Sequence, residues 1–542
     1  MKLMTPKNLL AALVGILAVY IGYFTHQVYL MDIRYEQWNK NEWHIDQFST
    51  PIFLIRFINA HYHNNGNNMI LAIMRKTIIK PALHKVTSLM EQADTENIVP
   101  KILCNTEAQT DLIQRVEQYY NDIQSSQTLT ITGKILLYGL SYMCLTNHYG
   151  LLTLGMKAEV QNERIVSPVF IASLPRTGST ILHRTMSLDT SRFRSFDLAD
   201  VIQPLVSSSS SSSQQPQKQQ PIPRWDKTAR AQNANAVTQI LNKIKLIYPG
   251  HMECLETLHG FRPNEADEDL GWYNNALGHP YMDALMKLYP QYQKRHLNDT
   301  IESIHVAKYR YAWLSMIMKI YQYNDKIEWE RRKHTEGRSF LREYSRPSMV
   351  LPWLMKDPNH SAYLTELISE FPDAKLIFTH RHPADVIPSL AKLFVVFTAP
   401  EVIPGTPGSS AKEWGEETLR RIKLNGIVEF TEAQNNNNGR YSFSSDGNDN
   451  DGNNDSTFRI DLSFEEVTQD VVGAITKIYE KFYPDQSNIS NTARSAFKKY
   501  LEKNEREKHG NQRRSLEDFH LTEDDVEFRE YTEMFLINGQ LN

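Results

Sequence analysis

The feature that most constrains the fold is a short turn between an apolar run and a helical pattern. The run "SPVFIA" is followed by "SLPRTGST", from Ser173 to Thr180, and then by "ILHRTMSLD". A buried strand that passes through such a turn into a helix brings backbone N–H groups and the positive end of a helix dipole together, which favours an anion. The stretch differs from the nucleoside-triphosphate loop G-x-x-x-x-G-K-[ST], because Ser173 replaces its first glycine and Ser179 its lysine.

Two further apolar runs pass into helical patterns in the same way. "LPWLMK" ends at Lys356 before "DPNHSAYLTELISEF", and "AKLIFTH" is followed by Arg381 and "PADVIPSLAKLF". Strand, turn and helix in alternation predict an α/β fold with a parallel sheet that binds ligands at the carboxyl ends of its strands. We therefore expect all three turns to face one crevice. Taken singly, each turn has a plainer interpretation: a tight turn capped by Ser179 or Thr180, a solvent-exposed strand-end lysine, and a surface ion pair at Arg381.

Length and composition exclude several classes of protein. The 542 residues suffice for two or three domains, or for one large α/β domain with insertions. A formal net charge of −4 does not support nucleic-acid binding, which needs a strongly basic face. The cysteines, Cys104, Cys144 and Cys254, lie in no short spacing, which excludes a zinc ribbon and a disulfide-rich scaffold. The sequence contains no H-E-x-x-H or comparable metal-binding spacing.

An apolar run near the N-terminus predicts a membrane anchor. Lys2 and Lys7 precede an uncharged stretch from Leu9 to Phe24, which as a helix is roughly long enough to span a thin bilayer. No small-x-small cleavage site follows, which favours a retained signal anchor over a removed signal peptide. The preceding lysines favour a cytosolic N-terminus. We therefore expect a single-pass type II membrane protein whose main domain lies in the Golgi or ER lumen, with an enzyme facing the cytosol as the alternative.

The rest of the chain divides into a helical lead-in and one larger domain. After a cytosolic tail and transmembrane signal anchor at 1–31, residues 32–160 show apolar residues at three- and four-residue spacing, which predicts helices that pack on the main domain. The main domain extends over 161–535. Serine- and asparagine-rich stretches at about 207–223 and 435–456 cannot bury apolar surface, so we expect disordered insertions there.

In this order, the three turn motifs resemble those of the sulfotransferase superfamily, whose members use 3′-phosphoadenosine 5′-phosphosulfate (PAPS). The likeness is greatest to broad sulfotransferase-family proteins that contain L-P-R-T-G-T-T-L-L-H-R, then W-x-x-K-x-P-x-H, then F-P-D-A with T-H-R-D-P and P-S. The stretches here read "LPRTGSTILHR", "WLMKDPNH" and "FPDAKLIFTHRHPADVIPS", and the likeness covers about residues 85–535. It implies a P-loop NTPase-like central parallel sheet flanked by helices, and metal-independent sulfuryl transfer by in-line displacement.

The resemblance also implies roles for individual residues. Those that would bind the 5′-phosphosulfate are Arg176, Thr177, Gly178, Ser179 and Thr180. Arg381 and Ser389 would bind the 3′-phosphate, and Lys508 is a second contact to it unless 506–514 is merely a surface charge run. Lys356 matches a lysine that approaches the bridging oxygen and the sulfuryl group. Positive charge there would stabilise the phosphate as the S–O bond breaks.

An acceptor hydroxyl also needs a base within hydrogen-bond reach as it attacks sulfur. In the protein-tyrosine branch of the superfamily this base is a glutamate shortly after the phosphate-loop helix, and here "SFDLAD" places Asp197 at the corresponding spacing. Because aspartate is one methylene shorter, Asp200 and His360 are alternatives. The acidic run "NEADED" at 264–269 either lines an acceptor pocket or forms a solvated loop and helix start.

Three functions therefore compete. The first is a membrane-anchored sulfotransferase that modifies a hydroxyl or amine of a carbohydrate, lipid or sterol, small metabolite or protein tyrosine. A P-loop kinase or NTPase is disfavoured by the missing lysine and by the lack of an apolar strand that ends in a clear magnesium-binding aspartate. A catalytically silent scaffold that binds nucleotide or glycan is the third, motivated by aspartate rather than glutamate at Asp197.

Overall fold

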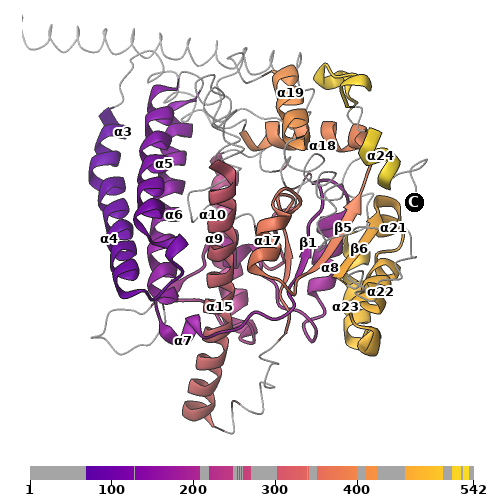
Figure 1. The fold of residues 1–542 in the computed structure, drawn as a ribbon, viewed down its shortest axis with the longest axis horizontal. Helices are drawn as coiled ribbons and strands as arrows, with labels where there is room; N and C mark the ends of the chain where they lie inside the picture. Colours follow the sequence, from indigo (N-terminus) through magenta and orange to yellow (C-terminus); the bar gives the residue numbers. More distant parts are fainter. Residues whose placement is uncertain are drawn as a thin grey trace, which may run out of the picture.

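The computed structural model of the chain has a central parallel sheet with helices on both of its faces (Figure 1). The residues that it describes are 69–126, 129–207, 219–247, 253, 256, 258, 260–269, 302–337, 340, 351–398, 410–423, 458–504, 515–526 and 529–535. The predicted anchor at Leu9–Phe24 and the predicted insertion at 435–456 lie outside these residues, as does Lys508.

The sheet has four parallel strands in the order β4-β1-β5-β6. In chain order they are β1 (Val169–Ile171), β4 (Leu354–Lys356), β5 (Lys375–His380) and β6 (Arg459–Ser463). The first three lie in the apolar runs that predicted strands, whereas β6 was not predicted. From the central strand β1 the chain passes first to β4 on one side and then to β5 on the other. The end of β1 is therefore a topological switch point, where open α/β sheets bind their ligands.

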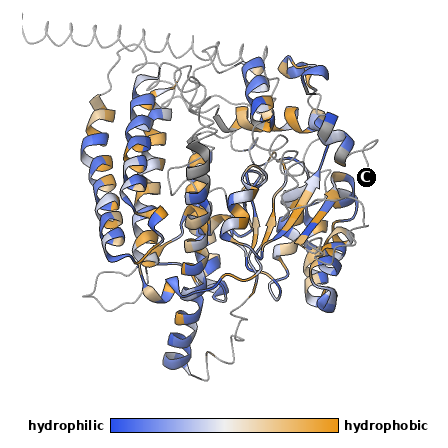
Figure 2. Ribbon diagram, in the orientation of Figure 1, coloured by the Kyte–Doolittle hydropathy of each residue, from blue (hydrophilic) through white to orange (hydrophobic). Residues whose placement is uncertain are grey.

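Alternating side chains give the sheet two buried faces, so the strands are apolar on both sides. Phe170 belongs to one hydrophobic cluster, and its neighbours Val169 and Ile171 belong to the other. Helices that bury residues in the Phe170 cluster are α15 (Glu302–Glu336), α17 (Leu364–Glu370) and α18 (Pro383–Thr398). Those that bury residues in the Ile171 cluster are α8 (Ser179–Ser187), α22 (Val471–Phe482) and α23 (Asn491–Lys503). Figure 2 shows the hydrophobic residues concentrated along the strands between these layers.

Helices near the N-terminus extend the Phe170 cluster away from the sheet. They are α3 (Met69–Met74), α4 (Lys80–Glu96), α5 (Thr106–Ser125), α6 (Ile131–Gly155) and α7 (Ala158–Gln161). Side-chain caps define two of their starts: Asn105 accepts from the backbone N–H of Ala108 at 2.8 Å, and Thr130 from that of Gly133 at 3.0 Å. These helices share one continuous core with the sheet.

The prediction of an α/β fold with a parallel sheet flanked by helices is confirmed, but the prediction of a transmembrane helix is not supported. Among the helices that the structure describes, none is both long enough and apolar enough to cross a membrane. The long helices α6 and α15 bury apolar residues in the shared core, although α6 also leaves Tyr142, Met143 and Tyr149 exposed. The assignment to a single-pass type II protein of the Golgi or ER lumen depended on the predicted anchor and is withdrawn with it.

The serine-rich stretch at 207–223 is bounded by a short hairpin. Strand β2 (Val206–Ser207) pairs antiparallel with β3 (Gln219–Gln220), and residues 208–218 between them lie outside the described part. Ile222 is buried, so the end of this predicted insertion belongs to the folded core.

Two helical glycines provide a test of packing. A Cβ at Gly415 in α19 (Ala411–Ile422) would lie 2.6 Å from the backbone oxygen of Phe519, which cannot move cheaply. We expect Gly415→Ala to lower the free energy of unfolding by about 2 kcal/mol. Gly139 in α6 has nothing within 4 Å of its Cβ position, so Gly139→Ala should instead raise it by about 0.5 kcal/mol. Urea denaturation measures both, and equal effects of the two variants would contradict this packing.

Candidate functional site

The loop between β1 and α8 has an unusual backbone. Arg176 has a φ of +66° and Gly178 a φ of +86°, both in the left-handed region that glycine adopts readily and other residues only at a cost. A Cβ at Gly178 would also lie 3.3 Å from Val467 of helix α21 (Phe464–Gln469). The turn leads directly into α8, whose first backbone N–H groups have no hydrogen-bond partner within the helix.

Hydroxyl groups fix this loop to the neighbouring strand β5. The Thr177 hydroxyl donates to the backbone oxygen of Leu174 at 2.7 Å and lies 2.6 Å from the hydroxyl of Thr379. The backbone N–H of Thr379 in turn donates to the Ser173 hydroxyl at 2.8 Å. All of these groups are buried. The loop conformation is thus set by β5 as well as by its own residues.

Two arginines meet at this loop. Arg381 Nη1 donates to the backbone oxygen of Arg176 at 3.1 Å, and Arg176 Nε donates to the Ser389 hydroxyl at 2.8 Å. The third partner of Arg176 is the backbone oxygen of Leu258 at 3.1 Å. Among the described residues no carboxylate pairs with Arg176, and burial together with the charge of Arg381 lowers the pKa of its guanidinium. Two neighbouring guanidinium groups beside a helix N-terminus favour an anion.

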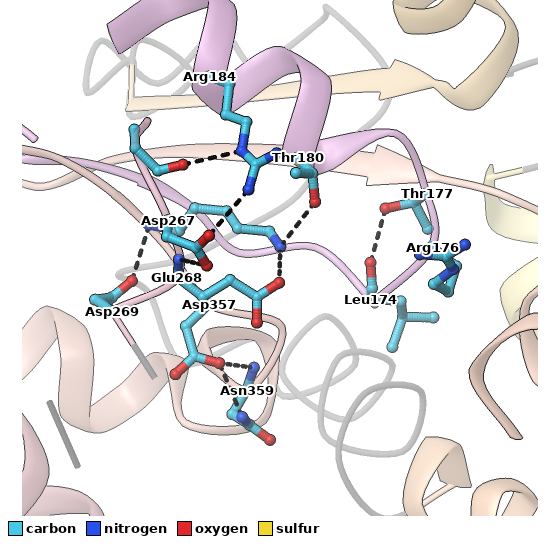
Figure 3. A network of polar contacts seen from close by, with 12 residues as sticks. Leu174, Arg176, Thr177, Thr180, Arg184, Asp267, Glu268, Asp269, Asp357 and Asn359 are labelled. Atoms are coloured by element: carbon cyan, nitrogen blue, oxygen red, sulfur yellow. Dashed lines mark hydrogen bonds and ion pairs between the residues drawn. The ribbon is translucent and has the colours of Figure 1, made fainter. Parts of the chain in front are cut away.

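Lys356 approaches the loop from the opposite side, at the end of β4. Its side chain is only 3% exposed, and its Nζ donates to the Thr180 hydroxyl at 3.3 Å. It also pairs with the carboxylate of Glu268 (Figure 3). The turns after β4 and β5 therefore both contact the loop after β1, through Lys356 at Thr180 and through Arg381 at Arg176.

The acidic run that contributes Glu268 packs into the fold and is not a solvated loop. Ala266, Asp267 and Asp269 are buried. Asp267 pairs with Arg184 of α8 at 2.9 Å, as Figure 3 shows. The only signal in the sequence was the density of carboxylates, which does not reveal which cations they contact.

Asp269 links this segment to strand β4. Its backbone N–H donates to the Lys356 oxygen at 3.1 Å, and its Oδ1 accepts from the Lys356 N–H at 2.9 Å. Its Oδ2 lies 3.0 Å from His360 Nε2. Burial acts to raise the pKa of Asp269, but the contact with His360 outweighs it and holds the pKa below its ordinary value.

His360 and Asp357 lie buried beside this link. His360 Nδ1 is 3.0 Å from the Tyr311 hydroxyl, and the ring is fully buried. Asp357 Oδ1 accepts from the backbone and side-chain N–H groups of Asn359, each at 2.8 Å. Asp269, Asp357 and His360 form the one trio among the described residues with metal-compatible spacing, their ligand atoms within 4.8 Å of one another.

The carboxylates of the predicted base Asp197 and of its alternative Asp200 stabilise the start of a helix. Asp197 is the N-cap of α9 (Leu198–Ile202), and the Asp200 carboxylate accepts from the Asp197 N–H at 2.9 Å to complete a capping box. Arg230 pairs with both carboxylates, at 2.8 Å from that of Asp200. Among the described contacts none joins either aspartate to Lys356.

The end of β5, next to Arg381, is covered by the last described helix, α24 (Arg529–Phe535). His380 Nδ1 lies 2.9 Å from the Tyr531 hydroxyl, and its ring stacks on Phe535 at 4.2 Å between centroids. Its Nε2 lies 2.7 Å from Asp461 of β6. Burial lowers the pKa of His380 below its ordinary value. No sequence motif had indicated this cluster.

A family model described as "Sulfotransferase family" matches residues 168–483, which include all four strands of the sheet. The sulfotransferase STF1 from Mycobacterium tuberculosis H37Rv has a similar structure, with a TM-score of 0.53, 17% identity, and coverage of 82% of this chain and 96% of that one. For the sulfotransferase STF9 from Mycobacterium avium the values are 0.57, 16%, 84% and 97%. No curated protein sequence matches.

Asp357 predicts a pH dependence of stability. Burial raises the pKa of its carboxyl from 3.8 to about 6, so its contribution to stability is fully present below 3.8 and lost as the pH rises through about 6. Asp357→Asn keeps the shape without the charge. We expect the variant to have a free energy of unfolding about 2 kcal/mol higher than the wild type at pH 8, with the difference vanishing near pH 4.

Urea denaturation over this pH range measures the difference. Asp385→Asn is the matched control, because the Asp385 side chain is 65% exposed. It should change stability little at any pH. A gain at Asp357→Asn that does not depend on pH would contradict the assignment of the effect to ionisation.

Proposed function

The chain belongs to the sulfotransferase family, and we propose that it takes its sulfuryl group from PAPS and passes it to a hydroxyl or amine of an acceptor. The observation that carries the choice of donor is the meeting of Arg176 and Arg381 at the loop before α8, with Lys356 on the other side. PAPS carries a phosphate at its 3′ position and a phosphosulfate at its 5′ position, and the loop offers cationic groups on two sides for these two anions.

The described residues fit such a donor. The loop N–H groups from Thr177 to Thr180 and the Arg176 guanidinium would bind the 5′-phosphosulfate. Arg381 and Ser389 would bind the 3′-phosphate, with Lys508 proposed as a second contact. Because Ser389 now accepts from Arg176, a phosphate there would exchange that hydrogen bond for one to a phosphate oxygen. Arg176 has no carboxylate partner within the described part of the chain, which leaves its charge available to an anion.

Lys356 would provide the positive charge that a nucleoside-triphosphate loop takes from its own lysine. When bound, PAPS would supply the sulfuryl group, and 3′-phosphoadenosine 5′-phosphate would be the leaving group. A buried ammonium within reach of Thr180 would stabilise the negative charge that develops on the leaving phosphate oxygen. This position on the neighbouring strand β4 is a physical reason why the loop can carry Ser179 where the triphosphate loop carries lysine.

The acceptor and its base are the less constrained part of the proposal. A hydroxyl of a carbohydrate, lipid or sterol, small metabolite or protein tyrosine is compatible with the family. Asp197 was the predicted base, and it keeps that candidacy only if its pair with Arg230 opens, since a carboxylate bound by a guanidinium is a poor proton acceptor.

Variants of the two arginines test the proposed donor. We expect Arg176→Ala and Arg381→Ala each to weaken binding of the product nucleotide 3′-phosphoadenosine 5′-phosphate (PAP) by more than tenfold, because each removes a charge-assisted contact to phosphate. Isothermal titration calorimetry measures the affinities. Arg331→Ala is the control, since its side chain is 56% exposed on α15 and pairs with Glu328. Unchanged PAP affinity in both loop variants would refute the proposed donor.

A further inference from the structure

We propose that Glu268 is the base that accepts the proton of the attacking acceptor; this inference rests on the proposed function. Its carboxylate pairs with Lys356 Nζ, the group that also donates to Thr180 in the anion-binding loop (Figure 3). Glu268 comes from the acidic run at 264–269, which the three turn motifs do not include.

Position is the first argument. In an in-line displacement the sulfur lies between the leaving phosphate oxygen and the attacking oxygen, with reacting atoms about 3 Å apart. The base that accepts the proton of the attacking oxygen therefore lies close to the cation that stabilises the leaving oxygen, with little more than the sulfuryl group between them. Among the described residues, Glu268 is the one carboxylate that pairs with Lys356.

Support from its neighbours is the second argument. Asp269 exchanges two hydrogen bonds with the backbone of Lys356 and contacts His360, which the Tyr311 hydroxyl holds from the far side. These contacts fix the chain immediately next to Glu268 against strand β4. Asp269 and His360 are therefore positioning residues, while the Glu268 side chain keeps 19% exposure and can meet a substrate.

The other carboxylates near Lys356 are committed elsewhere. Asp267 pairs with Arg184 at 2.9 Å, and Asp357 is buried with Asn359 on its Oδ1. Asp197 caps α9 and pairs with Arg230. Glu268 differs because its partner, Lys356, is itself a group that the proposed donor would engage. Donor binding would thus draw the ammonium toward phosphate and free the carboxylate at the same time.

The step balances without any further reactant. The acceptor O–H bond breaks and its proton passes to the Glu268 carboxylate. The acceptor oxygen forms a bond to sulfur, and the bond between sulfur and the bridging phosphate oxygen breaks. Its electron pair remains on that oxygen of PAP, beside Lys356.

The test uses the full chain with the 35S-labelled donor and water as the acceptor, and it measures release of labelled sulfate. Glu268→Gln should slow release at least 100-fold, because a positioned base contributes about 100-fold or more. Its PAP affinity should be equal to that of the wild type or up to several-fold tighter, since the variant leaves Lys356 without its carboxylate. Glu265→Gln is the matched control, a glutamate of the same segment with 15% exposure that pairs with Arg184 and Arg262, and it should release sulfate at the wild-type rate.

The outcomes separate this inference from the proposed donor. Release by Glu268→Gln within threefold of the wild type, or loss in Asp197→Asn alone, would overturn the inference. PAP binding weakened tenfold or a lower melting temperature in Glu268→Gln would assign Glu268 a structural role instead. A wild type that does not bind PAP would refute the donor itself.

Discussion

The arrangement of the site depends on the register of β1 between β4 and β5. Ile171, the last residue of β1, pairs with Lys356 on one side and with Ile377 on the other. The loop that follows Ile171 therefore emerges between the ends of two strands that lie about two hundred positions away in the chain. A slip of one residue would turn the Lys356 side chain to the opposite face of the sheet and separate it from Thr180. The residues of the separate sequence motifs are brought into one site only by this pairing of the strands.

Charge is distributed unevenly across the site. On one side, Arg176 has neutral partners, the Ser389 hydroxyl and the backbone oxygen of Leu258, and burial disfavours its charged form. Arg381 donates to the backbone oxygen of Arg176 and lies 3.8 Å from the carboxylate of Asp385. On the other side, Lys356 is neutralised by Glu268. A doubly anionic ligand would neutralise the guanidinium charge on the first side. On the second side it would compete with Glu268 for Lys356. The protein thus holds its cations in place beforehand, so that little reorganisation accompanies binding.

The predictable parts of this molecule are those with local signals. Strands β1, β4 and β5 are short apolar runs before helical patterns, and their end residues Arg176, Lys356 and Arg381 follow from them. Strand β6, "RIDLS", alternates polar and apolar residues but has only two apolar residues and follows an asparagine-rich stretch, so its signal is weak. Glu268 lies 88 positions before its partner, and no local pattern indicates such an ion pair. Asp197 lies at the sequence spacing that predicted a base, but in the fold it is contacted by Arg230, a residue distant in the sequence.

The cluster around His380 has a consequence for how the protein is made. Strand β5 carries Arg381 at its end, yet His380 beside it finds its hydroxyl partner in Tyr531, 151 positions further along. During synthesis the strand leaves the ribosome long before the helix that covers it. A nascent or prematurely terminated chain therefore has this ring without its partner and its stacking neighbour Phe535. Completion of the Arg381 side of the site is thus coupled to completion of the polypeptide.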